Sequence, residues 1–190
     1  MRTRRAGESA LLLLDAVAIM VAEGIEYAVV GSMAASVHGV VRASLDADAV
    51  MSLAVSRLRN LEQRFVAAGI QTQIRYGDPD DPIAAMLVLN DEHGNRVDLL
   101  VGLRGLEAEA FARAVEVPFQ GQVLKIIGCE DFIAMKVFAG GPQDITDARR
   151  VLQVAGASVD LPLLRRLAAR YGRQAHESLE SILSTHKDYR

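Results

Sequence analysis

The spacing of apolar and polar residues predicts helices and strands that alternate along the first part of the chain. Apolar residues recur at helical spacing over residues 8–23, and Gly24 follows where a helix should end. Residues 27–30 form a short apolar run typical of a strand, and helix-compatible residues follow at 33–38. The turn at 31–32 joins them, so the pattern predicts the order strand, tight turn, short helix.

The same kind of pattern predicts strands and helices in the rest of the chain. Pro118 would confine its strand to a sheet edge, because proline cannot donate a ladder hydrogen bond. From residue 129 onward only helices are expected, separated by glycines. Further strands are expected at 44–51, 71–75, 84–89, 96–101, 116–120 and 122–127, and further helices at 56–68, 106–114, 129–139, 143–155, 160–171 and 173–185.

This order of elements predicts an α/β (α+β) fold, a mixed β-sheet flanked by helices and followed by a C-terminal helical bundle. We place the α/β core in residues 1–128 and the helical region in residues 129–190.

Acidic residues are the first candidates for chemistry. A period of two puts Asp46 and Asp48 on one face of the strand expected at 44–51. Acids on a largely buried strand are costly unless they are paired or bind a metal. Asp98, flanked by Val97 and Leu99, is the best candidate for a third acid on a neighbouring strand. Three such carboxylates would form an oxygen-rich site of the kind that holds Mg²⁺.

The Gly31-Ser32 turn adds a second feature, because a glycine turn that opens a helix can present backbone N–H groups to an anion. Each signal has a plainer interpretation when taken alone. An Asp-x-Asp strand is often an exposed edge, and Gly-Ser before a helix is often only a cap. Their order along the chain is more informative than either signal.

That order is Gly31-Ser32, then Asp46-Ala-Asp48, then Arg96-Val-Asp98. It resembles the nucleotidyltransferase superfamily with the DNA polymerase β-type fold. A second match is the stretch at 130–147, Glu-Asp-Phe-Ile-Ala-Met-Lys-Val-Phe-Ala-Gly-Gly-Pro-Gln-Asp-Ile-Thr-Asp. It resembles the AbiEii-like nucleotidyltransferases, the toxins of type IV toxin–antitoxin systems.

The resemblance implies transfer of a nucleoside monophosphate from a nucleoside triphosphate (NTP) to an acceptor hydroxyl, on a tRNA 3′ end or a protein. It also implies a toxin held in check by a cognate antitoxin. The three acids would be catalytic and would bind two Mg²⁺ ions, with Mn²⁺ as a substitute: Asp46, Asp48 and Asp98. The nucleotide would be bound by Gly31, Ser32, Arg42 and Lys136.

An alternative to an enzyme is a catalytically silent nucleotide-binding or antitoxin-like module with the same fold. Retention of all three acids argues against it. Lys136 is one of only three lysines. We favour a phosphate contact over a lysine that merely extends from the core edge to solvent. Asp144 and Asp147 could equally be helix-capping residues or site residues, whereas His38 and Cys129 are expected to be structural.

Composition restricts the setting of this chemistry. The chain has 190 residues, 51% of them hydrophobic and 24% charged, as in ordinary globular proteins. A single cysteine excludes an internal disulfide, so a cytoplasmic location is expected. The apolar run at 10–21 is too short to span a bilayer, so no membrane partner is expected.

Charge is unevenly distributed. Residues 1–148 contain 13 Lys and Arg against 20 Asp and Glu, a net charge of −7, whereas residues 149–190 contain 8 against 4, a net charge of +4. We expect Arg165, Arg166 and Arg170 to meet an anionic acceptor such as RNA. The alternative is that these arginines form an ordinary solvated helix face.

Overall fold

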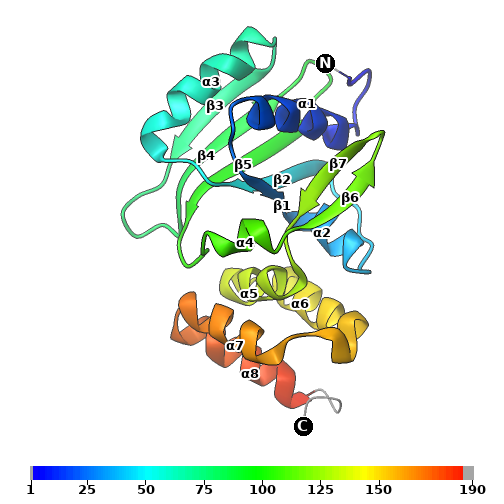
Figure 1. Ribbon diagram of the computed structural model, residues 1–190, viewed down its shortest axis with the longest axis vertical. Coiled ribbons are helices and arrows are strands. Elements are labelled where there is room, and N and C mark those ends of the chain that lie inside the picture. Colours follow the sequence, from blue (N-terminus) through cyan, green and yellow to red (C-terminus); the bar gives the residue numbers. More distant parts are fainter. Residues whose placement is uncertain (1, 186–190) are drawn as a thin grey trace.

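The computed structural model describes residues 2–185 (Figure 1). Within this range seven strands form one mixed sheet in the order β3-β4-β5-β2-β1-β7-β6. Their bounds are β1 (Tyr27–Val29), β2 (Asp46–Met51), β3 (Gln71–Tyr76), β4 (Ile83–Asn90), β5 (Arg96–Leu103), β6 (Val115–Phe119) and β7 (Gln122–Ile126).

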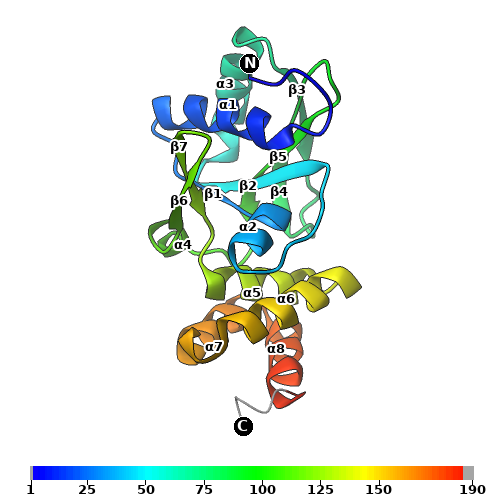
Figure 2. The same cartoon turned by 90° about the vertical axis from the view of Figure 1, so that its right-hand side faces the viewer.

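Eight α-helices accompany the sheet in the same range. Helices α5 to α8 gather at one end of the molecule, below the sheet in Figures 1 and 2, whereas α1 and α3 lie at the opposite end. The helices are α1 (Ser9–Ala22), α2 (Gly31–Val37), α3 (Leu58–Ala67), α4 (Glu109–Ala112), α5 (Cys129–Ala139), α6 (Pro142–Ala155), α7 (Leu161–Arg170) and α8 (Arg173–Thr185), with 3₁₀ turns η1 (Val55–Arg57) and η2 (Gly156–Ser158).

This architecture confirms the predicted mixed sheet flanked by helices and followed by further helices. The strand with Pro118 does lie at a sheet edge, as β6. The main difference is α4, which is only four residues long where a helix over 106–114 was expected. Glu107 precedes it, and its side chain is engaged by arginines from other elements, which holds this segment as a turn.

The central strands fix the orientation of the sheet's two faces. Alternate residues of β5, such as Val97 and Leu99, are fully buried in the core. Strand β2 pairs with β5 in parallel, and Asp48 stands opposite Asp98 in the register. The residues between the buried ones therefore point from both strands toward the other face of the sheet.

A single cluster of buried apolar side chains extends from α1 to α8. The sheet and the C-terminal helices thus share one core, and the division between residues 1–128 and 129–190 stays a prediction. Among the residues that the structure describes, no helix has both the length and the apolar character needed to cross a membrane.

An ion cluster joins the segment before α4 to the C-terminal helices. Glu107 is 8% exposed and accepts two hydrogen bonds from Arg166, at 2.8 and 3.0 Å. Arg113 Nη1 lies 2.8 Å from the same carboxylate. Arg113 also pairs with the buried Asp131 of α5, at 2.7 and 2.8 Å. The hydrogen bonds from Arg166 and Arg113 lower the pKa of Glu107 from 4.5 to about 2.

This cluster generates a stability prediction. Glu107→Gln should lower the free energy of unfolding at pH 7 by about 2–3 kcal/mol, because partly buried arginines lose their shared partner. The Glu107 contribution is complete above pH 4.5 and is lost as the pH falls from 4.5 to about 2. Urea denaturation at pH 7, 4 and 3 should therefore show a difference between the two proteins that shrinks with acidification. A constant difference would contradict the assignment.

Candidate nucleotide-transfer site

The acids predicted from the sequence meet on one face of the sheet. Asp46 and Asp48 alternate on β2 with the buried Ala47 and Ala49. In the parallel register with β5, Asp48 lies opposite Asp98, and Asp46 lies opposite Arg96. The small side chains at the buried positions let β2 lie in the centre of the sheet while its acids face outward. Three carboxylates are thus placed on neighbouring strands.

Burial and the neighbouring acids both disfavour the charged form of Asp48. Burial raises the pKa of Asp48 above its usual range, and the carboxylates of Asp98 and Asp46 raise it further. Lys136 and Arg42 act in the opposite direction. The acid face is therefore a region where added positive charge is favourable.

Arg96 supplies part of that charge and was missed as a functional residue. Its Nε donates to Asp98 Oδ1 at 2.8 Å, and its Nη2 donates to Asp98 Oδ2 at 2.9 Å. These hydrogen bonds to Asp98 raise the pKa of Arg96. The signal was present in the sequence, since positions 96 and 98 share a face of the same strand. The third acid is thus held in a bidentate ion pair.

The fit of these residues to a metal ion follows from this arrangement. Carboxylates that repel each other are the donors that Mg²⁺ prefers, and Asp46 and Asp48 fit that role in chemistry and position. Asp98 fits in strand register, but Arg96 occupies its carboxylate. Over residues 2–185, no three His, Cys, Asp or Glu side chains are gathered so that they could hold a metal ion together. Metal binding at the three acids stays a prediction.

Gly31 packs directly against Asp48. It is the first residue of α2 and has a φ of +63°, a conformation that glycine adopts without strain. A Cβ at this position would overlap Asp48 Oδ2 and would lie 3.0 Å from its Cγ. The Val30 N–H donates to the Asp48 carbonyl at 2.9 Å, which holds the turn against β2. A glycine is thus required both by the backbone and by the approach to Asp48.

Two basic side chains from distant segments reach the same region. Lys136 on α5 is 14% exposed, and its Nζ lies 2.7 Å from Asp144 Oδ1. Arg42, from the segment between α2 and β2, has its Nε 3.3 Å from Asp147 Oδ2. Lys136 is therefore a paired, largely buried cation rather than a lysine that extends to solvent. Asp144 and Asp147 also gain a clear role, as partners of these cations.

Two cavities, each of about 240 Å³, meet at Arg42. The first, here called the lysine cavity, is lined by Val30, Gly31, Arg42, Asp48, Leu100, Phe132, Met135, Lys136, Ala139 and Asp144. The second, here called the serine cavity, includes Ser32, Arg42 and Asp46 in its lining. The structure thus brings Gly31, Lys136 and Asp48 together and places Ser32 with Asp46 on the other side of Arg42. Asp98 lines neither cavity.

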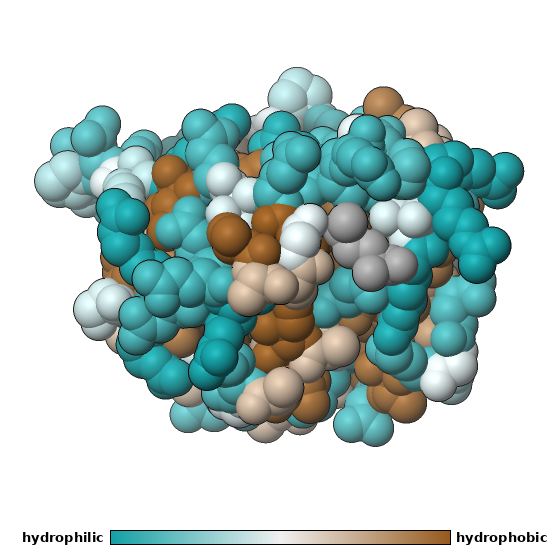
Figure 3. Space-filling view, turned by 90° about the horizontal axis from the view of Figure 1, so that it is seen from above, coloured by the Kyte–Doolittle hydropathy of each residue, from teal (hydrophilic) through white to brown (hydrophobic). Residues whose placement is uncertain are grey.

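Cavity volume alone would have indicated another place. A hollow of about 530 Å³ lies between the end of α1 and α3. That end of the molecule has apolar side chains near its centre and hydrophilic ones around them (Figure 3). None of the predicted site residues lines the hollow. The acids and cations, rather than the volume, define the candidate site.

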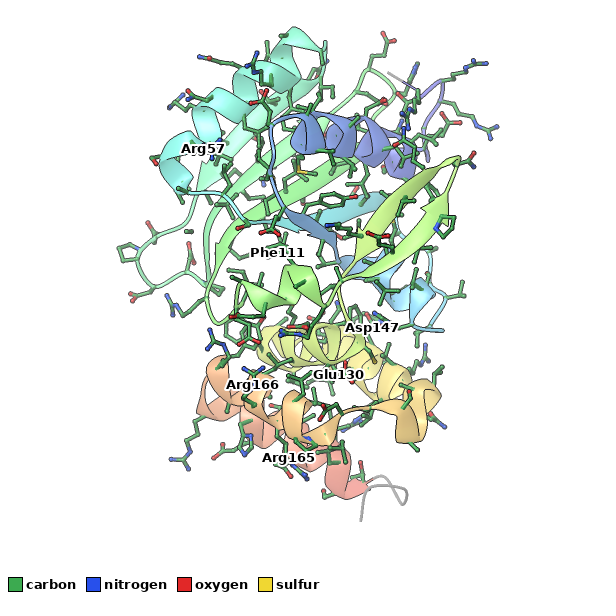
Figure 4. All side chains as sticks on the ribbon, viewed as in Figure 1. Arg57, Phe111, Glu130, Asp147, Arg165 and Arg166 are labelled. Atoms are coloured by element: carbon green, nitrogen blue, oxygen red, sulfur yellow. The ribbon has the colours of Figure 1, made fainter. Side chains whose placement is uncertain are left out.

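The arginines of the basic tail form ion pairs within the chain. Arg165 and Arg166 lie on α7 (Figure 4). Arg165 pairs with Glu180 at 2.7 Å, Arg166 pairs with Glu107, and Arg170 Nε lies 3.3 Å from Glu107. Each arginine expected to meet an anionic acceptor thus already has an acidic partner within the chain. Their side chains are 43–52% exposed, so contact with an anionic acceptor stays a prediction, beside the alternative of an ordinary solvated helix face.

His38 is structural, as expected. Its Nε2 lies 2.8 Å from the Ile127 carbonyl oxygen, and its ring contacts Phe132. These contacts fasten the end of α2 to the segment that leads into α5.

Solved structures of low sequence identity share the fold of this chain. The protein ANT(2″)-Ia, solved in complex with adenylyl-2″-tobramycin, aligns with a TM-score of 0.56 and 17% identity over 85% of this chain and 98% of that one. A putative nucleotidyltransferase from Thermotoga maritima gives 0.55 and 15%, over 80% and 97%. An antigenic nucleotidyltransferase-like protein from Paracoccidioides brasiliensis gives 0.52 and 13%, over 98% and 92%. The fold is that of a nucleotidyltransferase.

A sequence-family model assigns the chain to a family. The family described as nucleotidyltransferase of unknown function (DUF6036) matches residues 10–188, and the chain belongs to this family. No curated protein sequence matches the chain significantly.

The contact between Gly31 and Asp48 can be tested by stability alone. Gly31→Ala should destabilise the protein more than Gly24→Ala. Both glycines have a left-handed φ, +63° and +65°, which costs an alanine about 1–2 kcal/mol, but only Gly31 has a neighbour within 4 Å. In an Asp48→Ala background the extra cost of Gly31→Ala should disappear, as measured by urea unfolding. An unchanged extra cost would refute the close approach.

Proposed function

We propose that this protein transfers a nucleoside monophosphate from an NTP to an acceptor hydroxyl. One observation carries the proposal: Asp48, which stands opposite Asp98 in the parallel pair β2 and β5, lines the lysine cavity together with cations from two distant segments, in a chain of a nucleotidyltransferase family. An anionic polyphosphate needs cations, and a reaction at phosphorus needs a precisely positioned and charge-balanced site.

The residues divide this work between them. In the lysine cavity, Lys136 and Arg42 would neutralise the polyphosphate, and Gly31 lets the backbone approach closely at the turn. The acceptor oxygen would form a bond with the α-phosphorus, and the bond from that phosphorus to the oxygen bridging to the β-phosphate would break. Pyrophosphate leaves, and the hydroxyl proton passes to solvent. Ser32, in the serine cavity, would contact the phosphates from the other side of Arg42.

A divalent cation is part of this proposal. Asp46 and Asp48 would hold Mg²⁺ or Mn²⁺, and Asp98 would join them once it parts from Arg96. Bound there, the metal would neutralise phosphate charge and acidify the attacking hydroxyl, with two ions expected for this type of reaction.

The acceptor and the biological role are proposed from the resemblance at residues 130–147. By that resemblance the acceptor is a tRNA 3′ end or a protein hydroxyl, and the activity is that of a cytoplasmic AbiEii-like toxin restrained by an antitoxin. Two members of that stretch, Lys136 and Asp147, form an ion pair at 3.6 Å, and Lys136 lines the lysine cavity together with Asp48.

A silent nucleotide-binding module is the second candidate. The observation in its favour is the Arg96–Asp98 ion pair, which neutralises the third acid without a metal. The two candidates differ in turnover and agree in nucleotide binding.

Transfer is tested with α-³²P-labelled ATP, CTP, GTP and UTP, offered with Mg²⁺ and total tRNA or cell extract. The unmodified protein should label an acceptor, and Asp46→Ala/Asp48→Ala should reduce labelling by about 10³-fold or more, because the charge-balancing acids are gone. Asp80→Ala, an exposed acid outside the site, serves as the control. Equal labelling by the double variant and the control would rule out a catalytic role for Asp46 and Asp48.

Binding is tested separately by thermal unfolding. A bound NTP should raise the melting temperature by roughly 2–4 °C for each kcal/mol of linkage in a chain of this size. Lys136→Met should abolish the shift. A shift without transfer would favour the silent module, and the absence of a shift with all four nucleotides would reject both candidates.

A further inference from the structure

Asp147 is an unusually placed carboxylate. Its side chain is fully buried on α6, at the level where the helices meet the sheet (Figure 4). Gln143, one turn earlier, donates to Asp147 Oδ1 at 2.7 Å. The other oxygen, Oδ2, lies 3.3 Å from Arg42 Nε and 3.6 Å from Lys136 Nζ. A buried charge is tolerated only where such partners offset its desolvation.

The two cations, Arg42 and Lys136, come from segments that lie far apart in the sequence. Arg42 belongs to the segment between α2 and β2, whereas Lys136 belongs to α5. Among residues 2–185, Asp147 is the one acid within ion-pair distance of both. It therefore joins a segment next to the acid strand to a helix of the C-terminal layer.

The contacts on this oxygen are incomplete. Asp147 Oδ2 and Arg42 Nε are both buried, and within the described part of the chain neither has a hydrogen-bond partner. Buried polar atoms are normally satisfied, and those that are not occur often at functional sites. Arg42 thus lies beside Asp147 without a hydrogen bond from its Nε, and it lines the lysine cavity.

Asp144 plays a different part. Its side chain is 28% exposed, it lines the lysine cavity, and its Oδ1 lies 2.7 Å from Lys136 Nζ. An anion that enters the cavity meets the same ammonium group and competes with this carboxylate. Asp147, by contrast, is fully buried and does not line the cavity, and it lies within ion-pair distance of both cations.

We propose that Asp147 is a positioning residue that sets Arg42 and Lys136 at the lysine cavity to bind the polyphosphate chain of a nucleotide, and that Asp144 holds Lys136 until the phosphate arrives. This inference deepens the proposed function and rests on it. It assigns opposite roles to two carboxylates that lie three residues apart on one helix.

The two roles predict changes of opposite sign in polyphosphate binding when each acid is removed. If both acids only balanced charge, removing either would strengthen binding of a polyanion, since a nearby negative charge is lost. If Asp147 positions the cations, its neutral isostere weakens binding, because Arg42 and Lys136 lose their common anchor. Asp144→Asn should strengthen binding in either case. The sign of the Asp147→Asn effect therefore decides.

The probe is inorganic tripolyphosphate, which lacks a base and needs no turnover, titrated calorimetrically in EDTA. Compared with the unmodified protein, Asp147→Asn should weaken tripolyphosphate binding and so raise the dissociation constant by about tenfold or more, the usual size of the effect when a charged contact is lost. Asp144→Asn should tighten it about threefold. Asp131→Asn is the matched control, since it breaks another buried ion pair on α5, to Arg113, outside the cavity. It should lower the melting temperature and leave tripolyphosphate binding unchanged.

Equal or tighter tripolyphosphate binding by Asp147→Asn would overturn the positioning role while the proposed function stands. If the unmodified protein binds neither tripolyphosphate nor any NTP, both fall. Should Asp147→Asn not fold, Gln143→Met removes the hydrogen bond that orients Asp147 and keeps every charge. It should weaken binding in the same direction by roughly threefold, and unchanged binding would overturn the inference.

Discussion

Two carboxylates face each other across the parallel pair β2 and β5, and the arrangement around them follows from that repulsion. Asp48 lies opposite Asp98 with Asp46 nearby, and the pKa of Asp48 is raised by burial and by both neighbours. A fold that keeps such a face needs positive charge from elsewhere. Arg96 supplies it from the same sheet, while Arg42 and Lys136 supply it from outside. The glycine turn at the start of α2 then allows the backbone to come close to Asp48.

This demand for cations also links the sheet to the C-terminal helices. Lys136 and Asp147 belong to α5 and α6; Asp147 pairs with Arg42 and Lys136, and these two cations line the lysine cavity together with Asp48. A second ion cluster around Glu107 holds α7 against the segment before α4. Two groups of ion pairs, around Asp147 and around Glu107, therefore hold the C-terminal helices to the sheet, in addition to the shared apolar core. The attachment of these helices near the acids puts a wall on the lysine cavity, so the site exists only where the two parts meet.

The sequence was sufficient for what local periodicity encodes. The alternation at residues 44–51 indicated the shared face of Asp46 and Asp48, and the position of Asp98 in an apolar run indicated its strand. Pairing between distant side chains could not be predicted this way. The partner of Arg42 lies on α6, and Arg166 meets Glu107 from a helix that looks merely basic in sequence. Such contacts depend on tertiary packing, which no pattern of period two or 3.6 contains. The division of the predicted nucleotide residues between two cavities has the same origin.

In the proposed reaction, the ion pair of Arg96 with Asp98 would govern how the third acid becomes available. Its planar guanidinium matches the Asp98 carboxylate in a bidentate pair, which is among the stronger charged hydrogen bonds. A divalent cation that recruits Asp98 must compete with this pair. The competition is feasible because the Arg96 side chain is 32% exposed, so a released guanidinium can be solvated or can meet an incoming phosphate. Arg96 would then move from neutralising an acid to neutralising the substrate, and the total charge of the site would change little. The same exchange explains why the acids can be kept together without a metal: the arginine stands in for the positive charge until a stronger one arrives.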